Sequence, residues 1–163
     1  MLRKNISRLI AMSTLALLLA GCAATLPGKD SGQLPEFSAQ TISGENYSSV
    51  ELADRGALIW FWTPWCAICA QESADIVALT EANPDLLVIG IAGYGSSEEM
   101  AAFTQRTNTA YLTHLNDETG ALWSAFQVPI QPSLVAVNRQ GELRLNIGPT
   151  SAGDLQALAD WVK

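Results

Sequence analysis

Residues 57–69 read ALIWFWTPWCAIC, and this stretch decides the fold. Its first six positions form an unbroken apolar run, which is typical of a central strand covered on both faces. A Thr-Pro pair ends the run, and the pattern predicts a helix from Cys66 to about Ala82. The chain therefore places two cysteines, Cys66 and Cys69, where a buried strand passes into a helix.

The spacing of these two cysteines favours thiol–disulfide chemistry. One helical turn brings their sulfurs within reach of each other, so the pair is expected to form a redox-active disulfide. Cys66 lies at the predicted helix N-terminus, where free backbone N–H groups and the helix dipole favour a thiolate. Cys69 lies one turn deeper. We therefore expect Cys66 to attack the substrate and Cys69 to resolve the mixed disulfide.

Other uses of the pair fit the sequence less well. A zinc site needs four ligands, whereas the domain offers these two cysteines and one histidine, His114. A c-type haem site needs a histidine directly after the second cysteine, and residue 70 is alanine. A purely structural disulfide is the remaining alternative, but so short a loop would constrain the unfolded chain little. We expect no metal and no cofactor, and we place His114 at the surface or at the edge of a groove.

The remainder of the chain predicts an α/β fold: a central mixed β-sheet flanked by helices, with an N-terminal β-hairpin. The hairpin is expected at 37–52. Strands are expected at 57–62, 86–92, 112–115, 134–138 and 142–147, and helices at 66–82, 96–108, 119–126 and 151–163. Alternating βα units followed by an antiparallel strand pair favour a mixed sheet with helices on both faces.

The first 21 residues indicate an export signal. Three cations, Arg3, Lys4 and Arg8, precede a mostly apolar run at 9–20. The run is shorter than the roughly 20 residues that a permanent membrane helix needs. The pattern is that of a secretory signal peptide, which is removed from the mature protein.

The end of that run, Leu19-Ala20-Gly21-Cys22, resembles a bacterial lipobox. Such a signal implies that Cys22 is acylated and becomes the new N-terminus, and the alternative is an ordinary signal peptide with a chance cysteine. We therefore assign 1–21 to a lipoprotein signal peptide, 22–35 to a lipid anchor and flexible linker, and 36–163 to the folded domain. More than one acyl chain is needed for stable attachment, since each buried methylene contributes about 0.8 kcal/mol.

Composition narrows the classes of partner. The chain has 163 residues and a formal net charge of −7, and removal of residues 1–21 would leave six basic against 16 acidic residues. Nucleic-acid phosphates need Lys and Arg, so the acidic balance argues against nucleic acid, and likewise against adhesion to anionic lipid headgroups. Apart from Cys22 and the Cys-x-x-Cys pair, no cysteine remains for a structural disulfide. We expect one domain that is monomeric and is held at the membrane by its tether.

Residues 61–69 resemble the active-site stretch of thioredoxin-fold proteins, and among these the exported TlpA/ResA-like and DsbE-like group. The likeness continues in three further segments: Leu115-Asn116-Asp117, Phe126-Gln127-Val128 and Gln131-Pro132-Ser133. It covers about residues 35–163 and is closest to secreted actinobacterial DsbE/DsbF-type proteins. The resemblance implies a thioredoxin-like fold and the activity of a protein thiol–disulfide oxidoreductase.

The resemblance also implies roles for individual residues. Pro132 matches a cis-proline that faces the disulfide, so the Gln131–Pro132 bond would be cis and the neighbouring backbone would pair with an extended substrate peptide. Glu72 matches an acidic residue that could carry protons for Cys69, and the alternative is a solvated carboxylate in the first helical turns. Trp65 is expected to flank the substrate groove.

Three positions depart from the family pattern. Trp60 stands where cytosolic thioredoxins carry a buried Asp, so that proton relay is missing. Ala74 replaces a proline of many exported members, and Ala67-Ile68 lacks the Pro or His that tunes better-known members. Family rules for the redox potential therefore transfer poorly, and no charged neighbour in the sequence around Cys66 decides the direction of electron flow.

Three functions fit these residues. The first is an extracytoplasmic, membrane-anchored oxidoreductase that donates its disulfide to exported proteins and is recharged by an unidentified redox partner. The second, motivated by Glu72, is a ResA-like reductase that keeps apocytochrome cysteines reduced for haem attachment. The third is a non-catalytic metal- or thiol-binding lipoprotein, although copper-carrying relatives of the fold use a wider Cys-x-x-x-Cys spacing. We expect the first, on the outer face of the cell membrane, or on the periplasmic face in a cell with two membranes.

Overall fold

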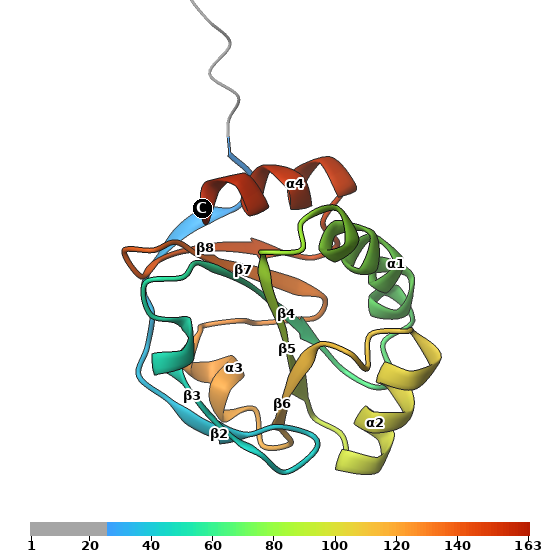
Figure 1. Cartoon of the computed structure of the whole chain (residues 1–163). Helices are drawn as coiled ribbons and strands as arrows, with labels where there is room; N and C mark the ends of the chain where they lie inside the picture. Colours follow the sequence, from blue (N-terminus) through green and yellow to red (C-terminus); the bar gives the residue numbers. More distant parts are fainter. Residues whose placement is uncertain (1–25) are drawn as a thin grey trace, which may run out of the picture.

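The computed structural model describes residues 26–163 (Figure 1). The signal peptide predicted at 1–21 and the acylation site predicted at Cys22 lie outside the described residues. Within the described part, no helix is long and apolar enough to cross a membrane.

A six-stranded mixed sheet forms the centre of the domain, in the order β1-β8-β7-β4-β5-β6 (Figure 1). Its strands are β1 (Lys29–Gln33), β4 (Ala57–Trp62), β5 (Leu87–Gly93), β6 (Thr113–Asp117), β7 (Ser133–Val137) and β8 (Glu142–Ile147). Strands β4, β5 and β6 are parallel, and β7 is antiparallel to both β4 and β8. The predicted mixed sheet and its antiparallel closing pair are thus confirmed.

Helices cover both faces of this sheet. They are α1 (Ala67–Ala82), α2 (Ser97–Arg106), α3 (Ala121–Ala125) and α4 (Ala152–Trp161), and the short 3-10 helix η1 spans Ser49–Leu52. Helices α1, α2 and α4 pack on one face. Helix α3 packs on the other, together with the hairpin of β2 (Ser38–Gln40) and β3 (Asn46–Ser48). The expected α/β fold with flanking helices and a small hairpin is confirmed.

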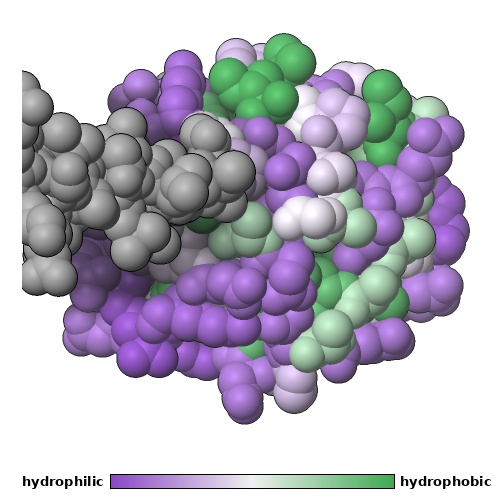
Figure 2. Space-filling view, turned by 90° about the horizontal axis from the view of Figure 1, so that it is seen from above, coloured by the Kyte–Doolittle hydropathy of each residue, from purple (hydrophilic) through white to green (hydrophobic). Residues whose placement is uncertain are grey.

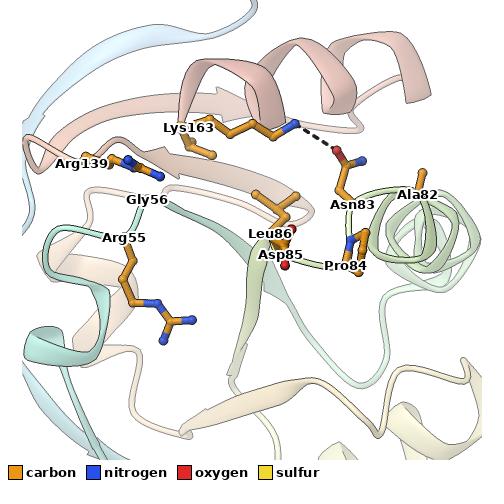
Figure 3. Close-up of a pocket in the computed structure, with 10 residues that line it drawn as sticks. Arg55, Gly56, Ala82, Asn83, Pro84, Asp85, Leu86, Arg139 and Lys163 are labelled. Atoms are coloured by element: carbon orange, nitrogen blue, oxygen red, sulfur yellow. Dashed lines mark hydrogen bonds between the residues drawn. The ribbon is translucent and has the colours of Figure 1, made fainter.

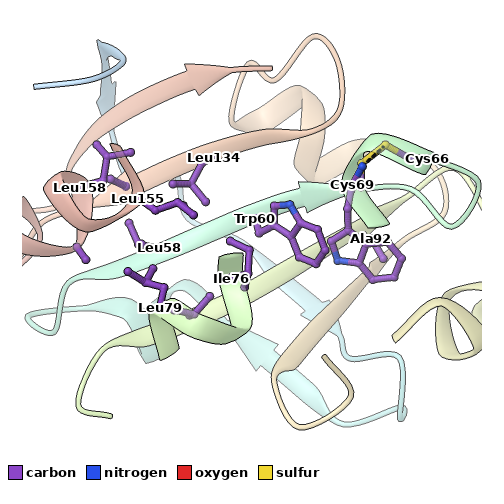
Figure 4. Packing of buried hydrophobic residues seen from close by; sticks show 14 of the residues in the cluster. Leu58, Trp60, Cys66, Cys69, Ile76, Leu79, Ala92, Leu134, Leu155 and Leu158 are labelled. Atoms are coloured by element: carbon purple, nitrogen blue, oxygen red, sulfur yellow. Dashed lines mark hydrogen bonds between the residues drawn. A yellow bond between two sulfur atoms is a disulfide. The ribbon is translucent and has the colours of Figure 1, made fainter. Parts of the chain in front are cut away.

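Strand β4 is buried along its whole length and divides two apolar clusters. Residues 58, 60 and 62 enter the cluster under α1, α2 and α4, and residues 57, 59 and 61 enter the cluster on the α3 side. Figure 4 shows the first cluster, in which Trp60 of β4 lies with Ile76 of α1. Both faces of the strand are covered, which explains why its sequence is an unbroken apolar run.

The flexible linker predicted at 22–35 is wrong over Lys29–Gln33, which form the edge strand β1 against β8. The guanidinium of Arg144 on β8 fixes the segment that leads into β1. It donates to the carbonyls of residues 26–28 and forms a salt bridge with Asp30 at 2.6 Å. Four of the five residues of β1 are exposed. Backbone hydrogen bonds to β8 therefore hold this strand in place, and its sequence shows no alternation of apolar and polar residues. The folded domain therefore begins before the predicted boundary at residue 36.

Candidate active site

Cys66 and Cys69 form a disulfide at the start of α1, with their Cα atoms 5.3 Å apart (Figure 4). Cys66 is the N-cap residue of the helix, and its sulfur accepts a hydrogen bond from the backbone N–H of Cys69 at 3.0 Å. Cys66 is 8% exposed, whereas Cys69 is fully buried. A substrate thiolate can therefore reach Cys66 alone, and the helix N-terminus there suits a thiolate.

Three hydrogen bonds hold the turn that leads into Cys66. The Cys66 N–H donates to the Thr63 carbonyl at 3.1 Å, which closes the turn. The Arg106 guanidinium, at the end of α2, donates to the Pro64 carbonyl. The Trp65 indole N–H lies 3.4 Å from the backbone oxygen of Tyr94. The contacts of Trp65 with Tyr94 and of Arg106 with Pro64 join residues that are 29 and 42 positions apart in the chain. No local sequence pattern predicts contacts over such separations.

Exposed apolar side chains flank the disulfide. Trp65, directly before Cys66, is 63% exposed. Ile68, between the cysteines, is 51% exposed, because helix α1 buries the face that carries Cys69 and Ile76. On the face of the molecule seen in Figure 2, by comparison, hydrophilic side chains predominate and hydrophobic ones form separate patches.

The Gln131–Pro132 peptide bond is cis, as predicted. Pro132 directly precedes β7, whose first residue pairs with Phe61 near the end of β4. The same end of β4 leads through three residues to Cys66. The structure therefore brings the predicted proline and the two cysteines to the same end of the two central strands β4 and β7. Gln131 is partly exposed there.

Glu72 is buried, at 6% exposure, one turn beyond Cys69 on α1. One carboxylate oxygen accepts a hydrogen bond from the Trp60 indole N–H, and the other accepts one from the Thr150 backbone N–H, each at 2.7 Å. Burial raises the pKa of Glu72 above its ordinary value, against the opposing effect of the two hydrogen bonds. The solvated-carboxylate alternative is thus wrong, because α1 turns this residue toward the core.

His114 on β6 is also buried, at 5% exposure, and the prediction of a surface or groove-edge histidine is wrong. Its Nδ1 accepts a hydrogen bond from the Trp62 indole N–H at 3.2 Å, and its Nε2 lies 2.9 Å from the Thr109 carbonyl, to which it donates. This pairing requires the neutral Nε2–H tautomer. Burial lowers the pKa of His114 to about 4. The side chain fits because its strand neighbour Gly90 has no Cβ.

A cavity of about 420 Å³ lies far from the disulfide, where α1 ends and β4 begins (Figure 3). Three cationic residues, Arg55, Arg139 and Lys163, line it. The Lys163 ammonium donates to the Asn83 side-chain oxygen at 3.1 Å. Helix α1 has 16 residues, so the cavity and Cys66 are separated by roughly 24 Å. This cavity is therefore not part of the redox site. Across residues 26–163, no group of three or more His, Cys, Asp or Glu side chains could hold a metal ion.

Comparison with known proteins gives consistent similarities. Residues 31–146 match the model of the AhpC/TSA family. The chain is 31% identical to the soluble secreted antigen MPT53 of Mycobacterium tuberculosis over 144 residues, which cover 88% of this chain and 83% of the relative.

Two solved structures extend this likeness to three dimensions. The structure of MTB DsbF, in mixed oxidized and reduced forms, has a TM-score of 0.76 and 27% identity over 80% of this chain and 99% of that one. A secreted Mycobacterium tuberculosis disulfide oxidoreductase homologous to E. coli DsbE has a TM-score of 0.70 and 30% identity over 77% of this chain and 95% of that one. The predicted thioredoxin-like fold is thus confirmed.

Proposed function

Because this chain belongs to the AhpC/TSA family and is a thioredoxin-like thiol–disulfide oxidoreductase, we propose that it exchanges disulfides with exported proteins and acts as the oxidant in their folding. The observation that carries this proposal is the Cys66–Cys69 disulfide, in which Cys66 alone is accessible, at a helix N-terminus. The similar mycobacterial proteins are secreted, which supports the predicted export of this chain.

In the oxidising direction, a substrate thiolate attacks the sulfur of Cys66. The new substrate–Cys66 bond replaces the Cys66–Cys69 bond, and Cys69 leaves as a thiolate that takes up a proton. A second substrate thiolate then attacks the substrate sulfur of this mixed disulfide, and Cys66 leaves as a thiolate. The substrate loses two electrons and gains one disulfide. An unidentified redox partner must afterwards take two electrons from Cys66 and Cys69.

We assign the proton for Cys69 to Glu72. The two residues are three positions apart on α1, so their side chains lie on the same helix face. A buried carboxyl with a raised pKa is protonated over a wider pH range than an exposed one, and it can return the proton when its environment favours the carboxylate. Its buried position favours proton transfer to Cys69 over exchange with bulk water.

The surroundings of Cys66 favour an extended, partly unfolded polypeptide as substrate. Trp65 and Ile68 offer exposed apolar surface on one side of the disulfide. The backbone at Gln131, beside Pro132, offers hydrogen-bonding groups at the same end of the sheet. Unfolded exported chains expose both apolar side chains and unpaired backbone, so a contact of this kind selects them over folded proteins.

The attachment to the membrane rests on Cys22 and its lipobox-like context. We propose that Cys22 is acylated after removal of residues 1–21 and that the domain works outside the cytoplasm at the membrane surface. Mass spectrometry of the mature N-terminus tests this. Acylated Cys22 in the membrane fraction is expected, and Cys22→Ala should release a protein that keeps its exchange activity. An unmodified N-terminus in the soluble fraction would overturn the anchor and leave the redox proposal intact.

Two measurements test the direction of electron flow. Refolding of a reduced, disulfide-containing substrate should be accelerated by the oxidised protein and lost in Cys66→Ser. The equilibrium potential against glutathione then separates the oxidant from the reductant, because known proteins of this chemistry span about −270 to −120 mV. A value below about −250 mV would contradict the oxidant.

The reductase for apocytochrome cysteines is the second candidate, and the burial of Glu72 favours it. A carboxyl whose pKa is raised by burial can supply the proton that the reduced Cys69 thiol needs. A low potential together with faster reduction of a peptide disulfide would support this candidate. Persistence of exchange in Cys66→Ser would contradict the Cys66 mechanism of both candidates. Absence of exchange in the wild type would instead leave a non-catalytic binding protein.

A further inference from the structure

The Arg106 side chain joins the end of α2 to the active-site turn. Its guanidinium donates to the carbonyl of Pro64, two residues before Cys66. The guanidinium carbon also lies 4.7 Å from the centroid of the Phe103 ring, one turn earlier on α2. The cation is therefore held between an aromatic face and a backbone oxygen.

The side chains under this contact are closely packed. Phe103 is fully buried and stacks on Trp62 of β4, with ring centroids 4.2 Å apart. On the far side of the turn, Gly95 approaches Pro64 so closely that a Cβ at residue 95 would overlap the proline ring. Arg106 thus packs on a buried aromatic side chain and donates to the active-site turn. The bond from the Cys66 N–H to the Thr63 carbonyl closes this turn.

Arg106 is also a cation in direct contact with the active-site turn. Residues 26–163 carry six cations: Lys29, Arg55, Arg106, Arg139, Arg144 and Lys163. Arg144 and Lys163 pair with acidic residues, and Arg55, Arg139 and Lys163 line the distant cavity. Among these six cations of the described residues, Arg106 is the one whose side chain donates to a residue of the turn 63–66.

Three carboxylates near the site accept hydrogen bonds from groups other than Arg106. Glu72 faces the core behind Cys69 and accepts two hydrogen bonds. Glu99 closes the capping box at the start of α2 through Ser96, and Glu118 accepts from the N–H of Ser97. Helix N-termini stabilise these last two charges, and within the described residues neither carboxylate forms a salt bridge with Arg106.

We propose that Arg106 is a positioning residue of the redox site, which fixes the turn before Cys66 and favours the Cys66 thiolate in the reduced protein. This rests on the proposed function, in which a substrate thiolate attacks the sulfur of Cys66 and Cys66 later leaves as a thiolate. A cation near a thiolate stabilises it. Stabilising the reduced form makes the disulfide a stronger oxidant. Arg106 thereby supplies the charged neighbour that the sequence around Cys66 lacks, and its sign favours oxidation.

Three variants test this role. Arg106→Met keeps an apolar stem over Phe103 and removes the charge, Arg106→Lys keeps the charge and loses the planar fork, and Arg139→Met removes the same charge at the distant cavity. The pH dependence of iodoacetamide alkylation gives the pKa of Cys66, and equilibration with glutathione gives the potential. In Arg106→Met the pKa of Cys66 should rise by roughly half a unit, with the potential more negative. Arg106→Lys should recover part of both changes, and Arg139→Met should match the wild type.

Salt and stability separate charge from structure. The difference between wild type and Arg106→Met should shrink as ionic strength rises, because the guanidinium is exposed to solvent. An unchanged pKa and potential in Arg106→Met would overturn the proposal, even if thermal stability fell. Equal shifts in Arg106→Met and Arg139→Met would also overturn it, since net charge would then explain both. Exchange activity in Cys66→Ser would instead overturn the proposed function itself.

Discussion

Trp60 donates its indole N–H to the carboxylate of Glu72 at 2.7 Å inside the core. Trp60 lies on β4 at the position where cytosolic thioredoxins carry a buried Asp, and Glu72 lies on α1. Strand β4 therefore supplies the hydrogen-bond donor, and helix α1 supplies the carboxyl group. This chain thus has a buried carboxyl near the cysteines, although an indole replaces the Asp of cytosolic thioredoxins on the strand.

Trp60→Phe should raise the pKa of Glu72 further. The substitution removes a hydrogen bond that favours the carboxylate and keeps most of the ring packing against Phe103. The pH profile of disulfide exchange should shift to higher pH, and stability should fall by about 1 kcal/mol. Trp62→Phe is the matched control, because its indole N–H serves His114 instead. Identical pH profiles for the two variants would contradict the role of the Trp60–Glu72 bond.

Glu72→Gln should change how stability depends on pH. The pKa of Glu72 is raised in the folded protein above its ordinary value of 4.5, so the folded state holds this proton more tightly than the unfolded state. Stability from this group is present below 4.5 and is lost as pH rises through the folded pKa. Urea unfolding between pH 4 and 8 should show the wild type losing stability relative to Glu72→Gln as pH rises. Parallel curves would mean that the carboxyl titrates normally.

The same variant also tests proton transfer. Glutamine cannot donate a carboxyl proton, so the reduction of the Cys66–Cys69 disulfide should slow when release of Cys69 limits the rate. Stopped-flow reduction by dithiothreitol, followed by tryptophan fluorescence, measures that step. Glu81→Gln, a neutralisation at the exposed end of α1, is the control, and equal rates for it and for Glu72→Gln would exclude a proton carrier at residue 72.

Local patterns predicted the part of the site that is local in the chain. The apolar run of β4, the Cys-x-x-Cys spacing and the start of α1 lie within 13 consecutive residues, and each follows from periodicity or capping. The environment of Glu72 did not follow, because its two partners lie 12 and 78 residues away. The same holds for the contact of Arg106 with Pro64, across 42 residues. Sequence periodicity carries no information on such distant pairings.

Strand β1 escaped prediction for a different reason. Its residues are small, polar and exposed, so the apolar signal that marks a strand is absent. What holds it is the exposed edge of β8 together with one side chain, Arg144. The turn-forming Pro-Gly pair at 27–28, which suggests a flexible spacer, instead shapes the entry to the strand: Gly28 has a φ of +76°, and a Cβ there would meet the Leu145 carbonyl.

Arg144→Ala should loosen β1 without disturbing the redox site. The loss leaves several backbone carbonyls without their donor and should cost roughly 1–3 kcal/mol. Hydrogen exchange should accelerate at the amides of Lys29–Gln33, while the potential stays at the wild-type value. Asp30→Asn is the control: the Asp30 side chain is 87% exposed, and an ion pair of that kind contributes little. Unchanged exchange in β1 after loss of Arg144 would show that strand pairing alone secures the segment.

His114 should make the protein sensitive to acid. Its pKa is lowered from 6.5 in the exposed state to about 4 in the folded protein, so the unfolded state binds a proton first as pH falls. The stability that depends on neutral His114 is complete above pH 6.5 and is lost as pH falls toward 4, by up to about 3 kcal/mol. His114→Gln should be less stable than the wild type at pH 7, because the substitution removes the Nδ1 acceptor of the Trp62 N–H. Because glutamine stays neutral at every pH, this variant should lose less stability than the wild type between pH 6.5 and 4. Urea unfolding at five pH values, compared as differences from the wild type, measures this. If both proteins lose stability equally over that interval, other groups account for the acid sensitivity, and the buried imidazole is a packing residue.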